Sequence, residues 1–214
     1  MEELIPSILF IGKGILITMQ LLIGSLAIGI TLGILASILK YKCIAISFIN
    51  RIISILRGTP VILQLAFIYF LVPSLLGVKL GIVGAGVITF GLNSSAYIAE
   101  ILRAGIESLP NGQFEAAKTL QIPVAYMWKD IILPQVLRNI LPAMTGEVVS
   151  LLKDTALIAT IGGMDIMRSA QTIAAEKFAY FMPLCIAGGY YYAFVLLIEC
   201  LGKKLEQGGQ HAKS

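Results

Sequence analysis

The sequence predicts an all-α membrane protein with about five transmembrane helices. Hydrophobic residues make up 57% of the chain and charged residues only 13%, and the mean hydropathy is +0.89. A water-soluble domain of this length needs far more polar surface. The apolar stretches must be helical, because lipid offers no partner for free backbone N–H and C=O groups. A membrane barrel would instead show segments of about ten residues with alternating hydropathy, and the sequence lacks them.

Charge-free runs account for four of the expected spans: Gly14–Leu39, Gly58–Val78, Leu80–Ala99 and Phe178–Ile198. Each has roughly the ~20 residues that cross a bilayer as a helix. A fifth, weaker candidate runs from Asn139 to Ile161 and carries Glu147, Lys153 and Asp154. We therefore expect one domain over residues 1–214, with spans near 10–39, 50–72, 80–104, 139–161 and 180–201 and a polar loop near 105–138.

The distribution of basic residues predicts how these spans are oriented. Most lysines and arginines fall in one set of loops: Lys40, Lys42, Arg51, Arg57, Arg103, Lys118, Lys129, Arg138, Lys203, Lys204 and Lys213. The loops on the other side hold Lys13, Lys79, Arg168 and Lys177. Because cytoplasmic loops carry the excess of basic residues, we expect the N-terminus outside and the C-terminus and the 105–138 loop in the cytoplasm. The basic residues are scattered, so we expect no nucleic-acid partner.

The first span carries a stripe of small residues. Ser25, Gly29, Gly33 and Ser37 are each four positions apart, so they lie on one helix face and let another helix approach closely. The stripe fits either an interface between subunits or packing within one bundle, and we favour packing within the bundle.

Two further spans each carry a stripe of polar residues. Glu147, Ser150 and Asp154 share one helix face, and Asn93, Tyr97 and Glu100 share another, with Ser94 beside it. Ionisable groups inside a membrane are costly and mark functional sites. The two stripes therefore suggest a water-accessible cavity that holds a zwitterion, or else a hydrogen-bonded network that only joins the helices. Glu100 and Arg103 are three residues apart and are expected to pair.

Catalytic and metal sites are not expected. The one histidine, His211, lies near the C-terminal end of the chain, and the three cysteines are isolated from one another. Neither a zinc site nor a nucleophile–base pair can be built from these residues. The sequence also has no G-x-x-x-x-G-K-[ST] phosphate loop.

The segment from Pro110 to Pro142 is polar and punctuated by prolines, although it lies between two spans. Its Glu115-Ala116-Ala117 motif resembles the EAA loop of ABC importer permeases. The resemblance covers nearly the whole chain and extends to Arg57-Gly58-Thr59-Pro60, Asn93-Ser94-Ser95-Ala96-Tyr97, Ala99-Glu100-Ile101, Gly112-Gln113, Leu133-Pro134-Gln135, Arg138-Asn139, Leu141-Pro142 and Leu152-Lys153-Asp154-Thr155. The chain resembles the permease subunits of polar-amino-acid ABC importers, the histidine/arginine/glutamine uptake group.

This resemblance implies a type I importer permease fold in a bacterial cytoplasmic membrane. It also implies transport of glutamine or of basic amino acids such as arginine and histidine. A second copy of the chain or a sister permease would complete the pathway. Two cytoplasmic ATPases would dock on the EAA loops, and an extracytoplasmic binding protein would deliver the substrate. The chain itself would not be an enzyme and would hold no cofactor, because ATP is bound by the ATPase.

The resemblance also assigns roles to residues. The expected substrate contacts are Thr59, Asn93, Ser94, Tyr97, Glu147 and Asp154. The expected ATPase-docking residues are Gly112, Glu115, Ala116, Ala117, Leu120 and Gln121. Glu115 is expected near the N-terminus of a short helix, where a carboxylate is favoured.

The loop departs from the family pattern at one position. Gln121 stands where the family usually has glycine, and a non-glycine residue in a left-handed turn costs about 1 kcal/mol. Pro123 pushes Ile122 toward extended geometry, so the helix should still end there. The shape of this turn, and which ATPase it fits, stay open.

Other functions compatible with a multispan protein remain open. An ion-coupled secondary transporter or channel could use Glu100, Glu147 and Asp154 as ion sites, but such proteins usually show internal repeats. A membrane enzyme would need a catalytic set that the sequence does not offer. A purely structural membrane subunit would need no transported substrate.

Overall fold

The computed structural model describes residues 4–211, with side chains to residue 207. All regular elements in this range are helical. Their bounds are α1 Leu4–Gly12, α2 Ile15–Tyr41, α3 Ile46–Gly58, α4 Val61–Ala66, α5 Val72–Leu76, α6 Ile82–Glu107, α7 Asn111–Thr119, α8 Val124–Tyr126, α9 Leu133–Asp154, α10 Ile166–Lys177 and α11 Phe181–His211. π-Helical turns at Phe67–Leu71 and Met127–Ile132 and a 3₁₀ segment at Thr155–Ile161 connect some of them.

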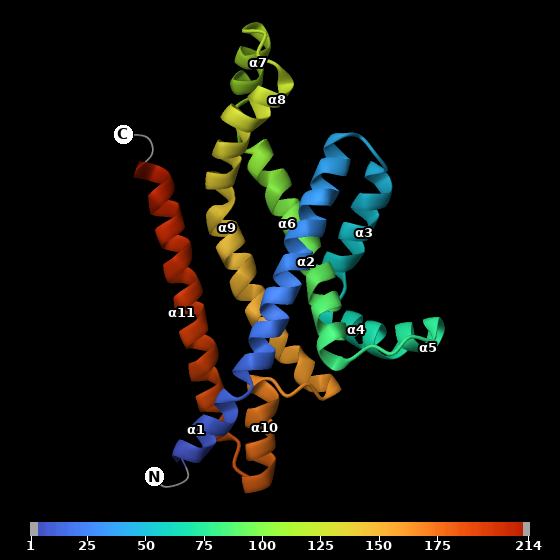
Figure 1. Ribbon diagram of the computed structural model, residues 1–214, viewed down its shortest axis with the longest axis vertical. Coiled ribbons are helices and arrows are strands. Elements are labelled where there is room, and N and C mark those ends of the chain that lie inside the picture. The colour runs from blue at the N-terminus through green and yellow to red at the C-terminus, as the bar shows by residue number, and fades with distance from the viewer. Residues whose placement is uncertain (1–3, 212–214) are drawn as a thin grey trace.

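The long helices α2, α6, α9 and α11 run along the length of the molecule (Figure 1). At one end lie α7, α8, the turn between α2 and α3, and the end of α11. At the opposite end lie α1 and α10, while α4 and α5 project sideways from the bundle. The loops with most of the basic residues and those with few are therefore at opposite ends of the molecule.

Three helical stretches are long and apolar enough to cross a membrane: Leu4–Tyr41, Ile82–Glu107 and Phe181–Gln207. The pair Ile46–Gly58 and Val61–Leu76 would give a fourth span, but the chain bends by 105° at the break between the two helices. The expected span near 50–72 is therefore a broken helix. The expected fifth span, near 139–161, falls partly in α9 and ends in the 3₁₀ segment Thr155–Ile161. It is not among these candidate spans, because α9 carries Arg138, Glu147, Lys153 and Asp154.

The small residues of α2 pack against α6, as favoured from the sequence. Ser25 Oγ donates a hydrogen bond to the Val87 carbonyl at 3.3 Å. A methyl group added to Gly33 would lie 2.8 Å from Ile98, closer than side chains tolerate. The stripe therefore brings the backbones of two helices of the same bundle together.

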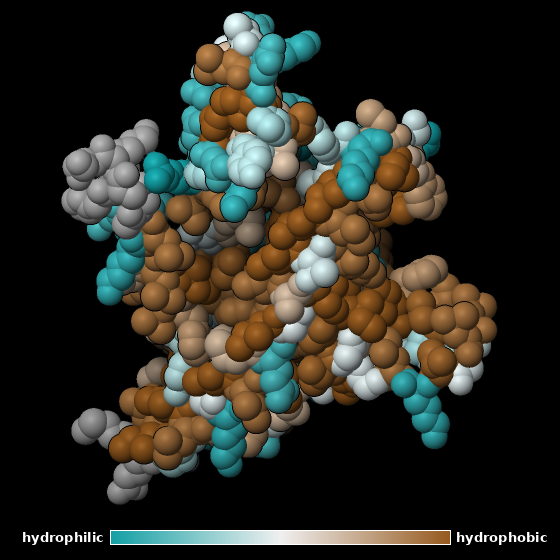
Figure 2. Space-filling view, turned by 45° about the horizontal axis from the view of Figure 1, so that its top comes forward, coloured by the Kyte–Doolittle hydropathy of each residue, from teal (hydrophilic) through white to brown (hydrophobic). Residues whose placement is uncertain are grey.

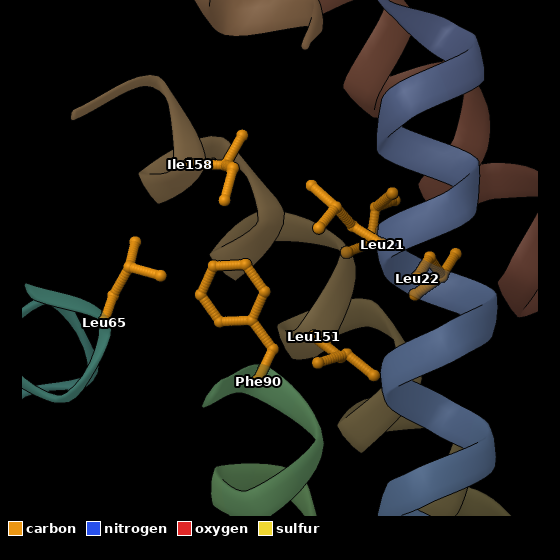
Figure 3. Close-up of a cluster of buried hydrophobic side chains, with 7 residues drawn as sticks. Leu21, Leu22, Leu65, Phe90, Leu151 and Ile158 are labelled. Atoms are coloured by element: carbon orange, nitrogen blue, oxygen red, sulfur yellow. The ribbon is translucent and has the colours of Figure 1, made fainter. Parts of the chain in front are cut away.

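A hydrophobic core joins the inner helices one turn away from the polar stripes. Leu21 and Leu22 of α2, Leu65 of α4, Phe90 of α6, Leu151 and Leu152 of α9, and Ile158 form one buried cluster (Figure 3). Phe90 is one turn before Asn93, and Leu151 follows Ser150 directly. Packing of this cluster fixes how the polar faces of α6 and α9 meet.

Much of the outer surface is apolar (Figure 2). Hydrophobic residues cover the middle of the visible face, and hydrophilic residues gather toward the end formed by α7 and α8. Large apolar side chains such as Phe67, Phe70 and Phe181 are more than half exposed. A surface of this kind faces lipid rather than water.

Candidate functional site

A polar cavity of about 410 Å³ opens between three segments of the chain. The break between α3 and α4, the middle of α6 and the second half of α9 supply its lining: Thr59, Pro60, Val61, Asn93, Tyr97, Glu147, Ser150 and Asp154. The cavity suggested by the two polar stripes is therefore present, and five of the six expected substrate contacts line it. We call it the substrate cavity after these expected contacts, whose role stays a prediction.

The break between α3 and α4 follows from Pro60, which has no N–H to continue the helix. Thr59 is extended, with φ −115° and ψ 144°. The Leu56 carbonyl instead accepts hydrogen bonds from Gln64 Nε2 at 2.8 Å and Asn93 Nδ2 at 2.9 Å. Asn93 thereby ties α6 to the broken helix while lining the cavity.

Ser94 lies behind the cavity wall rather than in it. Only 1% of its surface is exposed, and its Oγ donates a hydrogen bond to Glu147 Oε1 at 2.6 Å. Since Glu147 is on α9, this bond fixes the carboxylate with respect to α6. Ser94 therefore holds Glu147 in position.

Among the described residues, the cavity carries two carboxylates and no opposing cation. Within the described chain, no lysine or arginine lines it. Asp154 also receives no hydrogen bond and forms no ion pair with the described residues. A carboxylate in a partly enclosed site is costly without a cation or a donor. The cavity is therefore suited to a ligand that carries an ammonium or another cationic group.

The expected pair between Glu100 and Arg103 is confirmed, with Arg103 Nη2 2.9 Å from Glu100 Oε2. Glu100 does not line the substrate cavity. It lies one turn of α6 beyond Tyr97, toward α7.

The loop expected near 105–138 is shorter in the structure, because α6 continues to Glu107 and α9 begins at Leu133. The residues between them fold into α7, α8 and a π-helical turn at the tip of the molecule (Figure 1). Gly112, Glu115 and Ala116 are exposed, and Leu120 is 72% exposed. Ala117 is buried, with 2% of its surface exposed. Its small side chain therefore serves packing within this chain, whereas its neighbours form an open face.

Gln121 adopts the left-handed conformation that the family pattern indicates, with φ of +52°. Its N–H donates to the Lys118 carbonyl at 3.1 Å, and the Ile122 N–H donates to the Ala117 carbonyl at 3.0 Å. These bonds close the end of α7 in the way that a glycine usually does. The turn forms although its central residue is not glycine.

The expected position of Glu115 was wrong. Glu115 is the fifth residue of the nine-residue α7, whose first turn contains no acidic residue. The dipole effect falls off within the first turn, so it does not account for a glutamate here.

Pro60, Val61 and Ser150 also line the cavity, although they were not among the expected substrate contacts. A signal was available for Ser150, which lies three residues after Glu147 and four before Asp154. None was available for Val61, because its place follows from the bend. Among the described side chains, no group of three His, Cys, Asp or Glu residues could hold a metal ion.

Comparisons with known proteins identify the family of the chain. Residues 29–208 match the family of binding-protein-dependent transport system inner membrane components. The chain is 44% identical to a putative glutamine transport system permease protein of Rickettsia typhi, over 94% of each chain. It is 42% identical to an arginine transport system permease protein of Bacillus subtilis, over 95% of this chain and 94% of that one.

Solved structures show the same fold. A crystal structure of an amino acid ABC transporter with histidines aligns with a TM-score of 0.83 and 33% identity, over 92% of this chain and 93% of that one. An inward-facing structure of the MetNI methionine ABC transporter aligns with a TM-score of 0.71 at 16% identity, over 96% and 95% of the two chains, and shows the fold alone. The chain therefore belongs to the binding-protein-dependent transport system inner membrane components, the non-enzymatic, multi-pass membrane subunits of ABC importers.

Proposed function

We propose that the chain is the permease of an ATP-driven importer for polar amino acids, with basic amino acids such as arginine or histidine as the preferred class. The observation that carries the proposal is the substrate cavity, which has two carboxylates and, among the described residues, no basic side chain. A cationic amino acid brings two positive groups and one negative group, so its net charge complements such a cavity.

Glutamine is the second candidate. Its ammonium can meet Asp154 or Glu147, and the side chains of Asn93 and Thr59 can exchange hydrogen bonds with its amide. The name of the Rickettsia typhi relative supports this reading, and that of the Bacillus subtilis relative supports arginine.

Five of the cavity residues have a role in this proposal. Asp154, which has no partner among the described residues, accepts hydrogen bonds from the cationic group of the substrate. Glu147 does the same in an orientation fixed by Ser94. Thr59, Asn93 and Tyr97 supply polar contacts around the substrate.

Members of this family work with an ATPase and a binding protein. We propose that two copies of this chain, or one copy with a sister permease, assemble with two cytoplasmic ATPases that bind ATP. The chain itself needs no cofactor. The exposed face of α7, with Gly112, Glu115, Ala116, Leu120 and Gln121, would dock the ATPase, and Ala117 would support it from inside.

The proposed site is a bacterial cytoplasmic membrane, with the N-terminus outside and the C-terminus and α7 in the cytoplasm. The basic loops at the α7 end support this orientation. An extracytoplasmic binding protein would deliver the amino acid to the end of the molecule formed by α1 and α10.

The connectivity suggests how the docking face and the cavity communicate. α6 leads into α7, and the loop returns into α9, so the loop joins two walls of the substrate cavity. Trp128 also donates from Nε1 to the Tyr41 hydroxyl of α2 at 2.9 Å. Movement of α7 by the ATPases would therefore shift α6 and α9 with respect to each other.

Uptake by purified complexes in liposomes tests the proposal. Complexes of the chain with its ATPase and binding protein should take up radiolabelled arginine or glutamine only with ATP inside. Asp154→Asn should lower uptake about 30-fold or more, because a partly buried charge partner is lost. Lys153→Gln is the matched control, since Lys153 is adjacent but does not line the cavity. Equal uptake by both variants would contradict the assigned role of Asp154.

A further inference from the structure

A second cavity, of about 400 Å³, adjoins the substrate cavity toward α7. We call it the vestibule. Its polar lining residues are Arg57, Tyr97, Glu100, Arg103, Ser108 and Asn139. Tyr97 lines both cavities. The vestibule extends along α6 from Tyr97 to Ser108, near the end of that helix, so it connects the substrate cavity with the α7 end of the molecule.

The charge of the vestibule is opposite to that of the substrate cavity. Glu100 forms ion pairs with Lys40 at 3.4 Å, Arg57 at 3.6 Å and Arg103 at 2.9 Å. Arg103 also pairs with Glu107. Three cations therefore share two carboxylates, and the cluster keeps an excess positive charge.

Arg57 is the cation with the weakest partner in this cluster. Its ion pair is the longest of the three with Glu100, and 41% of its side chain is exposed. Its guanidinium lies over the Tyr97 ring, 5.2 Å from the centroid. It donates no hydrogen bond to the residues that the structure describes. A guanidinium with free N–H groups in a cavity is suited to bind a carboxylate through two parallel hydrogen bonds.

We propose that the vestibule is a second binding station, in which Arg57 takes the carboxylate of the amino acid after it leaves Glu147 and Asp154. This inference rests on the proposed function. The two stations suit the two ends of an amino acid, since one offers carboxylates and the other a guanidinium. Tyr97 separates the substrate cavity from the vestibule. The Arg57 guanidinium packs on its ring. Ser108 and Asn139, joined by a hydrogen bond of 3.1 Å, line the vestibule beside it.

Lys40 provides the control that separates this role from a structural one. Lys40 and Arg57 each form an ion pair with Glu100. If these ion pairs only joined α2, α3 and α6, replacing Lys40 and replacing Arg57 would have the same effect on substrate binding. Lys40 does not line the vestibule, whereas Arg57 does. Substrate binding in the vestibule should therefore depend on Arg57 and not on Lys40.

Equilibrium binding of radiolabelled arginine to the nucleotide-free permease–ATPase complex in nanodiscs tests the proposal. The unaltered complex should bind two arginines per permease chain. Agmatine, which is arginine without its carboxylate, should displace only the one in the substrate cavity. Arg57→Gln should bind one arginine and Lys40→Gln should bind two. Asp154→Asn should lose the substrate-cavity site but keep the vestibule site. Loss of arginine binding in the substrate cavity can therefore be distinguished from loss of binding in the vestibule.

Arg57→Lys guards against a loss of folding, because it keeps the charge facing Glu100 but removes the planar fork. It should weaken the vestibule site about tenfold, which corresponds to one bidentate contact, and leave the other site unchanged. One arginine per chain in the unaltered complex would overturn the proposal. The same result for Arg57→Gln and Lys40→Gln would overturn it as well.

Discussion

The substrate cavity and the tip formed by α7 and α8 differ in how their side chains are held. Other residues of this chain hold several of those of the cavity, whereas several of those at the tip are exposed. In the cavity, hydrogen bonds between helices fix the polar side chains, as Ser94 does for Glu147 and the Leu56 carbonyl does for Asn93. At the tip, Glu115, Ala116 and Leu120 point away from the rest of the chain and are exposed. In the proposed function, the cavity is a site for a small ligand that this chain forms by itself, whereas the exposed tip needs a partner protein to complete an interface.

The difference shows how each region should respond to mutation. A change in the cavity should act on substrate affinity and leave the assembly of subunits intact. A change at the tip should act on assembly and leave the fold of the membrane helices intact. Single substitutions in each region can test this separation.

Glu115→Arg should abolish both ATPase association and uptake. It reverses a charge on the exposed face of α7, and a repelled charge at a docking surface costs several kcal/mol. Co-purification of the ATPase and uptake in liposomes measure the two effects.

Glu176→Arg is the control for this variant, because it makes the same change at an exposed site of α10, at the other end of the molecule. Both variants should reach the membrane in equal amounts. If Glu115→Arg keeps its ATPase, the tip is not the docking surface.

The helices and the polar stripes could be predicted from the sequence, because hydropathy and helical spacing are local properties. The spacing of Asn93 and Tyr97 and of Glu147 and Asp154 suggested a cavity, but it fitted a hydrogen-bonded network between the helices as well. The 105° bend could not be predicted, since a proline such as Pro60 fits the first turn of a helix as well as a break. The positions of Ser94 and of Arg57 over Tyr97 depend on contacts between distant segments, which local spacing does not contain.

Gly105→Ala tests whether the two regions are rigidly connected. Gly105 lies on α6 between the cavity and the tip, and an added methyl group would overlap Ile140 of α9. Overpacking of this kind costs about 1–3 kcal/mol. Thermal unfolding of the complex should therefore occur at a lower temperature, and uptake should fall with it.

Gly146→Ala on α9 is the matched control, since no atom lies within 4 Å of its added methyl group. That variant should match the unaltered protein. If Gly105→Ala does so too, α6 and α9 are not closely packed at this point.

Ser94→Ala should weaken substrate binding without affecting ATPase association. It removes the hydrogen bond to Glu147, and a hydrogen bond to a charged group contributes about 1.5–3 kcal/mol. We expect at least a tenfold rise in the dissociation constant, measured by radioligand binding. Ser37→Ala, whose Oγ donates to its own helix at the Gly33 carbonyl, should leave binding unchanged. A large loss of ATPase association in Ser94→Ala would contradict the separation of the two regions.

Gln121→Gly should have the smallest effect and should increase stability. It relieves a left-handed backbone conformation that costs a non-glycine residue about 1 kcal/mol. Protection of the α7–α8 loop from proteolysis should rise, whereas substrate affinity should stay the same. A loop that becomes easier to cleave would show that the Gln121 side chain stabilises the turn.

Affinity purification of the tagged chain from native membranes in mild detergent, followed by mass spectrometry, tests the central claim most directly. We predict that an ABC-type ATPase is recovered at one copy per permease chain, and that Glu115→Arg loses it while Asp154→Asn keeps it. If no ATPase is recovered, although a control importer keeps its ATPase under the same conditions, the assignment of the tip as a docking surface is contradicted.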